Sequence, residues 1–111
     1  MSLKDKAKKL GAAIVFKKLY SEFKAKKEKR DEDITILIEY VEEWKANAPD
    51  DLNSILASIL IKAQTGSTED LQEEIEKAKS EYNPEDLDFV PWFESQIEVI
   101  EEEKEAEQAE E

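Results

Sequence analysis

Residues 52–63 read LNSILASILIKA and carry the clearest structural signal in the sequence. Apolar residues recur there at intervals of three and four, which places them on one face of an α-helix. A half-buried β-strand would instead alternate apolar and polar residues. We therefore predict a helix at the centre of the core, with Ile55, Leu56 and Ile59 fully buried. The complete apolar stripe consists of Leu52, Ile55, Leu56, Ile59, Leu60 and Ala63.

The residues on either side of this stretch indicate where the helix begins and ends. Pro49 suits a first helical turn, where its missing N–H costs nothing. Asp50 and Asp51 would place negative charge at the positive end of the helix dipole. Gly66 suits a left-handed C-terminal cap, because glycine has no Cβ. These residues predict a helix that begins at Pro49 and ends at Gly66.

Further helices are predicted on the C-terminal side. The first begins at Ser67 or Thr68 and has a thin apolar stripe, so it should be a surface helix with one buried edge. Asn83 and Pro84 start a short helical turn, and Pro91 opens the last helix. The inward-facing residues are Leu71, Ile75, Ala78 and Tyr82 in the first of these helices and Trp92, Phe93, Ile97 and Ile100 in the last.

One short sequence occurs twice. The stretch PDDL at residues 49–52 recurs as PEDL at residues 84–87, 35 residues later, which is close to the period of helix-turn-helix repeats. Residues 66–84 resemble the second half of a tetratricopeptide repeat, but Ile55 and Lys62 stand where the first half has Trp and Tyr. We interpret the recurrence as two similar helix starts within one bundle.

The N-terminal segment contains two apolar stripes. At about 100° per residue, they lie on nearly opposite faces of one helix. Either the helix bends near Gly11, where glycine costs about 1 kcal/mol relative to alanine, or its two faces contact different surfaces. We expect the second stripe in the core and the first on a contact surface. The first stripe is Leu3, Ala7, Leu10 and Ile14, and the second is Phe16, Leu19, Tyr20 and Phe23.

The segment that follows allows more than one interpretation. Residues 24–33, KAKKEKRDED, contain no large apolar residue, but they also contain no Gly or Pro that would break a helix. Residues 15–47 could therefore form one continuous helix, or Asp31 or Asp33 could cap a new one. A strand over residues 34–38 is disfavoured, because it would expose apolar residues. The stripe here is Ile34, Leu37, Ile38, Val41, Trp44 and Ala48.

The composition also indicates a helical protein of one domain. Of the 111 residues, 41% are charged and 40% are hydrophobic, and there are only two Gly and three Pro, which is typical of long amphipathic helices. We predict an all-α bundle of four to five amphipathic helices, with one long N-terminal helix as an open alternative. Its parts are a basic amphipathic segment (residues 1–33), a helical core (34–100) and an acidic tail (101–111).

The net charge of −13 is unevenly distributed. Residues 1–30 contain 11 Lys and Arg against 3 Asp and Glu, whereas residues 31–111 contain 5 against 26. Such asymmetry indicates an electrostatic partner at one end of the chain or attraction between the two ends. Residues 101–111, EEEKEAEQAEE, favour a helix but have nothing to bury. We expect a frayed helical extension or a disordered tail there.

The sequence lacks the residues that most catalytic and metal sites need. It contains no His and no Cys, the commonest general base, thiol nucleophile and soft-metal ligands. Its two Gly, at positions 11 and 66, are too far apart for a phosphate-binding loop. Asp31, Glu32 and Asp33 point in different directions on a helix, so we interpret them as a solvated cap. We predict no catalytic, cofactor-binding or metal-binding residues and do not expect an enzyme.

The basic N-terminal segment carries the sharpest functional signal, because lysines surround its apolar residues. Helices of this kind dock into a partner's groove or lie on anionic membranes. Our first hypothesis is a small non-catalytic adaptor or regulator that binds another protein, or itself by self-association, through this helix or an apolar groove. The expected partner-binding residues are Leu3, Ala7, Leu10, Ile14, Lys8, Lys9, Lys17 and Lys18.

Two alternative functions are left open. One is a peripheral membrane protein anchored by residues 3–23, and the other is an acidic regulator that mimics nucleic acid or associates with it through residues 24–30. The overall acidity disfavours nucleic acid as a partner of the core, and no small-molecule substrate is evident. The longest apolar run, residues 10–16, is too short to span a bilayer, so we expect a cytoplasmic protein.

Overall fold

Five α-helices make up the fold. The computed structural model describes residues 3–26, 28, 31–66 and 70–109, and the side-chain surroundings of residues 11–106 within these ranges. No strand occurs in these ranges, so the predicted all-α bundle of four to five helices is confirmed. The helices are α1 (Leu3–Ala25), α2 (Asp31–Asn47), α3 (Leu52–Thr65), α4 (Leu71–Glu81) and α5 (Phe89–Ala109).

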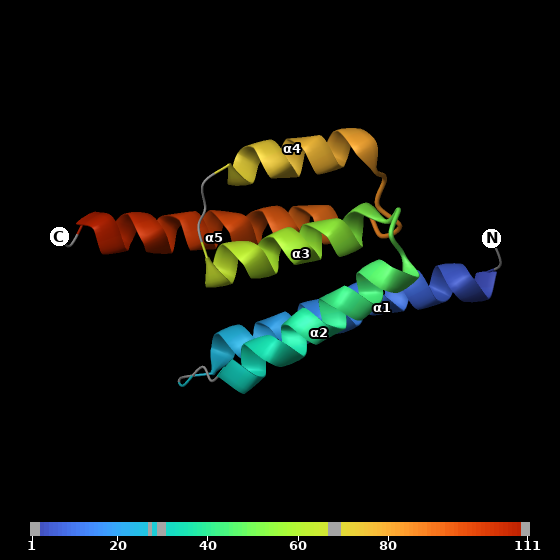
Figure 1. The fold of residues 1–111 in the computed structure, drawn as a ribbon, viewed down its shortest axis with the longest axis horizontal. Helices are drawn as coiled ribbons and strands as arrows, with labels where there is room; N and C mark the ends of the chain where they lie inside the picture. The colour runs from blue at the N-terminus through green and yellow to red at the C-terminus, as the bar shows by residue number, and fades with distance from the viewer. Residues whose placement is uncertain (1–2, 27, 29–30, 67–69, 110–111) are drawn as a thin grey trace.

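α3 is the central helix of the bundle, because it contacts each of the other four. Consecutive helices run in opposite directions, and α4 lies across α3 from the α1–α2 pair (Figure 1). The bundle measures 53 × 30 × 20 Å, and the N-terminal end of α1 and the C-terminal end of α5 project at opposite ends of its long axis (Figure 1). The most apolar stripe of the sequence thus lies on the helix with the most neighbours.

A cluster of aromatic rings joins α1, α2 and α5 in the core. Phe16 of α1 is fully buried at its centre. Its ring lies 5.8 to 6.4 Å, between centroids, from those of Tyr20, Tyr40, Trp44, Phe89 and Trp92. Tyr20 and Phe23 are also buried and Leu19 packs against the core, so the predicted placement of the second N-terminal stripe is confirmed.

The predicted burial of α3 is correct for two of its three named residues. Leu56 is fully buried, and Ile59 is 9% exposed at the edge of the core. Ile55 is only partly buried, so the prediction for this residue is wrong. Its side chain lies in a groove over α3, between α2 and α4, where no helix covers it. Because α3 is central, it also buries polar residues beside the stripe, namely Asn53 and Ser54.

α3 begins later than predicted. Its first residue is Leu52, and Asp51 is the N-cap, because the Asp51 carboxylate accepts a hydrogen bond from the Asn53 N–H at 3.0 Å. Pro49 and Asp50 therefore precede the helix instead of forming its first turn. The buried carboxylate of Asp51 satisfies a helix N–H that has no intrahelical partner, and this contact sets the start of the helix.

The two similar PDDL and PEDL stretches lie side by side. The Leu52 N–H donates to the Asn83 carbonyl at 3.0 Å, and the Glu85 N–H donates to the Asp51 carboxylate at 3.1 Å. An isolated parallel β-bridge joins Asp51 and Asn83. Only the first stretch starts a helix, so the interpretation as two helix starts is wrong for the second.

The connection between α3 and α4 differs from the predicted one. Gly66 follows α3 with φ −146° and ψ −143°, so it is not a left-handed cap. Its carbonyl instead accepts a hydrogen bond from the Lys104 ammonium of α5 at 2.7 Å. The left-handed residue is Asp70, with φ 59°, directly before α4. Ser67 and Thr68, the predicted start of this helix, lie outside the described residues.

α5 begins two residues earlier than predicted. The stretch after Asn83 and Pro84 is a non-helical turn, and α5 starts at Phe89, whose N–H donates to the Asp86 carbonyl at 3.3 Å. Pro91 therefore lies within the first turn and does not open the helix. That position accepts proline, because the first N–H groups of a helix have no intrahelical partner.

α5 continues past Ile100, the last residue of its apolar stripe, to Ala109. Of the two predictions for this segment, a helical extension and a disordered tail, the structure shows the helical extension. Polar contacts hold this extension to the bundle. Gln72 of α4 donates to the Glu101 carboxylate at 2.8 Å, and Lys24 of α1 lies 3.5 Å from the Glu103 carboxylate. Contacts across the bundle thus add to the helix propensity of the glutamate-rich sequence.

The helical structure is interrupted between α1 and α2. α1 ends at Ala25 and α2 begins at Asp31, so the interpretation with a new helix near Asp31 is confirmed, and one continuous helix and a strand are both wrong. Asp31, Glu32 and Asp33 occupy the first turn of α2, where negative charge is favourable. Lys26 reaches across the break and lies 2.6 Å from the Asp33 carboxylate.

α1 is a single helix through Gly11, and replacing Gly11 with alanine is expected to stabilise the protein by about 0.5 to 1 kcal/mol. Apart from its own stretch of helix, a Cβ at Gly11 would have no described neighbouring atom within 4 Å, so alanine fits there and mainly lowers the entropy of the unfolded chain. Urea denaturation measures the gain. Gly66→Ala is the control, because its Cβ would lie 3.3 Å from the Lys62 carbonyl. A loss of stability at Gly11 contradicts the prediction.

Candidate functional site

The outward face of α1 is the first candidate surface. Ile14 is 61% exposed and Val15 is 46% exposed, although the neighbouring Ala13 and Phe16 are fully buried. Lys18 is exposed on the same helix. α1 therefore has a core face and, beside it, apolar side chains that no described part of the chain covers. Contiguous exposed apolar groups of this kind mark contact surfaces more often than isolated ones.

The structure describes three of the eight predicted partner-binding side chains. Ile14 and Lys18 are exposed, and Lys17 is partly buried. The other five belong to residues 1–10, whose side chains lie outside the described ones; they are Leu3, Ala7, Lys8, Lys9 and Leu10. Sequence periodicity missed Val15, because Val15 belongs to neither of the two N-terminal apolar stripes.

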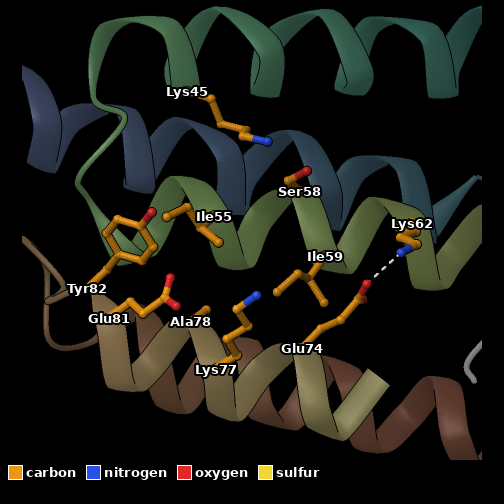
Figure 2. Close-up of a pocket in the computed structure, with 10 residues that line it drawn as sticks. All are labelled: Lys45, Ile55, Ser58, Ile59, Lys62, Glu74, Lys77, Ala78, Glu81 and Tyr82. Carbon is orange, nitrogen blue, oxygen red and sulfur yellow. Dashed lines mark hydrogen bonds and ion pairs between the residues drawn. The ribbon is translucent and has the colours of Figure 1, made fainter. Parts of the chain in front are cut away.

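A groove over α3, between α2 and α4, is the second candidate surface. Its volume is about 290 Å³ (Figure 2). Ile55 and Ile59 of α3 and Ala78 of α4 line it with apolar surface, and Tyr82 lies at one end. At the other end, Lys62 and Glu74 form an ion pair with 2.7 Å between Nζ and Oε1.

Cations converge on this groove from three helices. Residues 31–111 contain only five Lys and no Arg, yet Lys45 of α2, Lys62 of α3 and Lys77 of α4 all line it. Lys45 and Lys77 make no ion pair with a described acidic side chain, in contrast to Lys62. Two carboxylates, of Glu74 and Glu81, also line the groove. The lining therefore carries a net positive charge in a chain whose net charge is −13.

Two tyrosines of the core act as hydrogen-bond donors. Burial raises the pKa of Tyr20 well above its usual value, and the nearby Glu103 carboxylate raises it further. Burial likewise raises the pKa of Tyr40, with a smaller contribution from Glu43. Both phenols are therefore neutral at physiological pH. The Tyr20 hydroxyl donates to Gln64 at 3.0 Å and the Tyr40 hydroxyl to the Ala12 carbonyl at 2.9 Å, which ties α1 to α3 and α2.

Two other kinds of site are absent from the described part of the chain, a membrane-spanning helix and an acidic metal site. Within these residues, no helix is long and apolar enough to cross a membrane. No three acidic side chains there are grouped so as to hold a metal ion. No protein-family model, curated protein or solved structure matches the chain.

Proposed function

We propose that this protein is a non-catalytic interaction module, a small adaptor or regulator that captures another protein with the outward face of α1. One observation carries the proposal: Ile14 and Val15 are 61% and 46% exposed on a helix whose next residue, Phe16, is the centre of the core. Both side chains are exposed to solvent in the bundle. A partner that buried both would gain about 0.7 to 1.8 kcal/mol for each, because about half of each side chain is exposed in the free protein.

The proposed surface extends from Ile14 towards the N-terminus. α1 is one uninterrupted helix from Leu3 to Ala25, so the 3.6-residue period assigns the earlier apolar residues to the Ile14 face. Its position at one end of the long axis leaves room for a partner (Figure 1). The proposed binding residues are Leu3, Ala7, Leu10 and Ile14, with Lys8, Lys9, Lys17 and Lys18 around them.

The charge of the segment supports a partner with an acidic surface. Residues 1–30 carry 11 basic residues against 3 acidic ones, and opposite charges across an interface speed association and favour the correct partner. A second copy of the chain meets this requirement too, because residues 31–111 carry 26 acidic residues. We also propose a cytoplasmic location, because nothing in the sequence indicates secretion.

Ile14→Glu is expected to weaken association at least tenfold and to change the free energy of unfolding by less than about 0.5 kcal/mol. The carboxylate would remove the apolar contact but would stay in water in the free protein. Leu87→Glu is the matched control, because Leu87 is 75% exposed in the connection before α5. Sedimentation velocity over a concentration series measures self-association, and a photo-crosslinking residue at position 14 or 87 detects other proteins in an extract.

We expect a discrete adduct from position 14 that is absent from position 87, or a concentration-dependent oligomer that Ile14→Glu abolishes. Identical adducts from both positions, together with a monomer at every concentration, would contradict the proposal. Unfolding of Ile14→Glu would assign this stripe to the core. Sedimentation with anionic vesicles that high salt reverses would assign α1 to a membrane surface instead.

A further inference from the structure

We propose that the groove between α2 and α4 binds a small amphipathic anion of the aliphatic monocarboxylate class, with the carboxylate between Lys45 and Lys77 and the chain on Ile55 and Ile59. This site is separate from the outward face of α1 and does not depend on the function proposed for that face. The groove residues come from α2, α3 and α4, so it forms only when the three helices pack together.

The floor of the groove is apolar and only partly covered. Ile55 and Ile59 belong to the most apolar stripe of the chain, yet Ile55 is only partly buried and Ile59 lies at the edge of the core. Ala78 on the facing side of α4 is too short to cover them, so the groove stays open (Figure 2). An aliphatic chain on this floor would cover the exposed part of Ile55 and the remaining exposed 9% of Ile59. Each methylene group that this removes from water would raise the affinity about fourfold.

Two lysines of the groove, Lys45 and Lys77, are available to an anionic ligand. Lys45 and Lys77 enter the groove from opposite sides of α3, and neither pairs with a described acidic side chain (Figure 2). Lys79, only two residues from Lys77, lies 2.5 Å from the Glu94 carboxylate on α5. Carboxylates are abundant in this chain, so two cations left without one at an apolar groove match an anionic ligand head.

The volume of the groove favours a small ligand over a peptide helix. About 290 Å³ is just below the usual range for small-molecule sites, about 300 to 1,000 Å³, so the groove fits only a small ligand. A helix with its side chains is about 10–12 Å across and needs a longer trough. The carboxylate of Glu81 beside Tyr82 also lines the groove, which favours a single anionic head near Lys45 and Lys77 over an extended polyanion.

The test is a titration of the full chain, labelled with ¹⁵N, with sodium octanoate, followed by amide chemical shifts. We expect saturable shifts confined to α3, the C-terminal end of α2 and α4, and an affinity about 15-fold higher than that of hexanoate, the factor for two buried methylene groups. Octan-1-ol, which has the chain without the charge, and acetate, which has the charge without the chain, should each bind at least tenfold more weakly.

Matched variants locate the carboxylate. The double variant Lys45→Gln/Lys77→Gln is expected to bind octanoate at least tenfold more weakly, whereas Lys79→Gln should bind as the parent does. All three lysines are exposed, so these variants should fold, and circular dichroism checks that they do. Ile14→Glu should leave octanoate binding unchanged, which separates this site from the outward face of α1.

Three results would overturn the proposal. One is shifts spread over all five helices or absent from α3. Another is equal binding of octanoate, octan-1-ol and acetate, which would show that the groove does not recognise the aliphatic chain and the carboxylate of one ligand together. The third is an equal loss in Lys79→Gln and in the double variant, since that would reflect only the net charge of the protein.

Discussion

Replacing Phe16 with alanine is expected to lower the free energy of unfolding by about 3 to 5 kcal/mol. Phe16 is fully buried, and its ring contacts aromatic rings of both α2 and α5. Alanine would leave a cavity where α1, α2 and α5 meet, and it would also remove ring contacts that contribute beyond the buried area. A domain of this size has about 5 to 15 kcal/mol in total, so the variant should lose at least about a fifth of its stability.

Urea denaturation followed by tryptophan fluorescence measures this loss directly, because Trp44 and Trp92 both contact the Phe16 ring. Val15→Ala is the matched control: it truncates the adjacent residue, which is half exposed, and should cost less than about 1 kcal/mol. A loss of less than about 1 kcal/mol for Phe16→Ala would mean that α1 adds little to the core.

Replacing Asp51 with alanine is expected to cost about 2 to 4 kcal/mol. The Asp51 carboxylate accepts hydrogen bonds from two backbone N–H groups, that of Asn53 at the start of α3 and that of Glu85 in the connection before α5. Loss of the N-cap alone costs about 1 kcal/mol. The part-buried Glu85 N–H would also lose its acceptor. This costs about 1 kcal/mol more, rising towards about 3 kcal/mol where water does not replace the carboxylate.

Two neighbouring substitutions test this role of Asp51. Asp51→Asn keeps an oxygen that can accept both hydrogen bonds and should cost less than Asp51→Ala. Asp50→Ala removes an exposed carboxylate from the same turn and should cost less than about 0.5 kcal/mol. Thermal denaturation compares all three, and amide exchange should show faster exchange at Glu85 in Asp51→Ala alone. Equal losses in Asp50→Ala and Asp51→Ala would contradict the assigned role.

Periodicity alone identified most of the helical segments and most of the core. The stripes around Phe16, Leu56 and Ile97 each fit one helical face, and the structure buries all three residues. Periodicity could not settle the break before Asp31, because residues 24–33 contain neither an apolar stripe nor a helix breaker. The break depends instead on α1 and α2 folding back to bury the aromatic cluster, which is a tertiary effect.

The errors lie where contacts between distant residues determine local structure. Asp51 sets the start of α3 with a carboxylate that also holds Glu85. Gly66 is not left-handed, and its carbonyl accepts a hydrogen bond from Lys104 of α5. Both contacts join residues more than 30 positions apart, so no local pattern contains them.

The two candidate surfaces differ in how far sequence could reveal them. The exposure of Ile14 was expected, because its stripe lies opposite the one that contains Phe16. The groove was not, because its lysines are separated by 17 and 15 residues and belong to three helices. Only the packing of α2 and α4 on either side of α3 brings them together.

The hydrogen bonds at Asp51 and Asn83 also bear on how the native state opens locally. They join the two ends of the segment that contains α3 and α4. Leu52 is hydrogen-bonded to Asn83, and Asp51 is hydrogen-bonded to Glu85. α4 has a thin apolar stripe and would fray easily alone, but its C-terminal end is fixed to the N-terminal end of α3. α3 and α4 should therefore behave as one cooperative unfolding unit, and α4 should be released only when this unit opens as a whole.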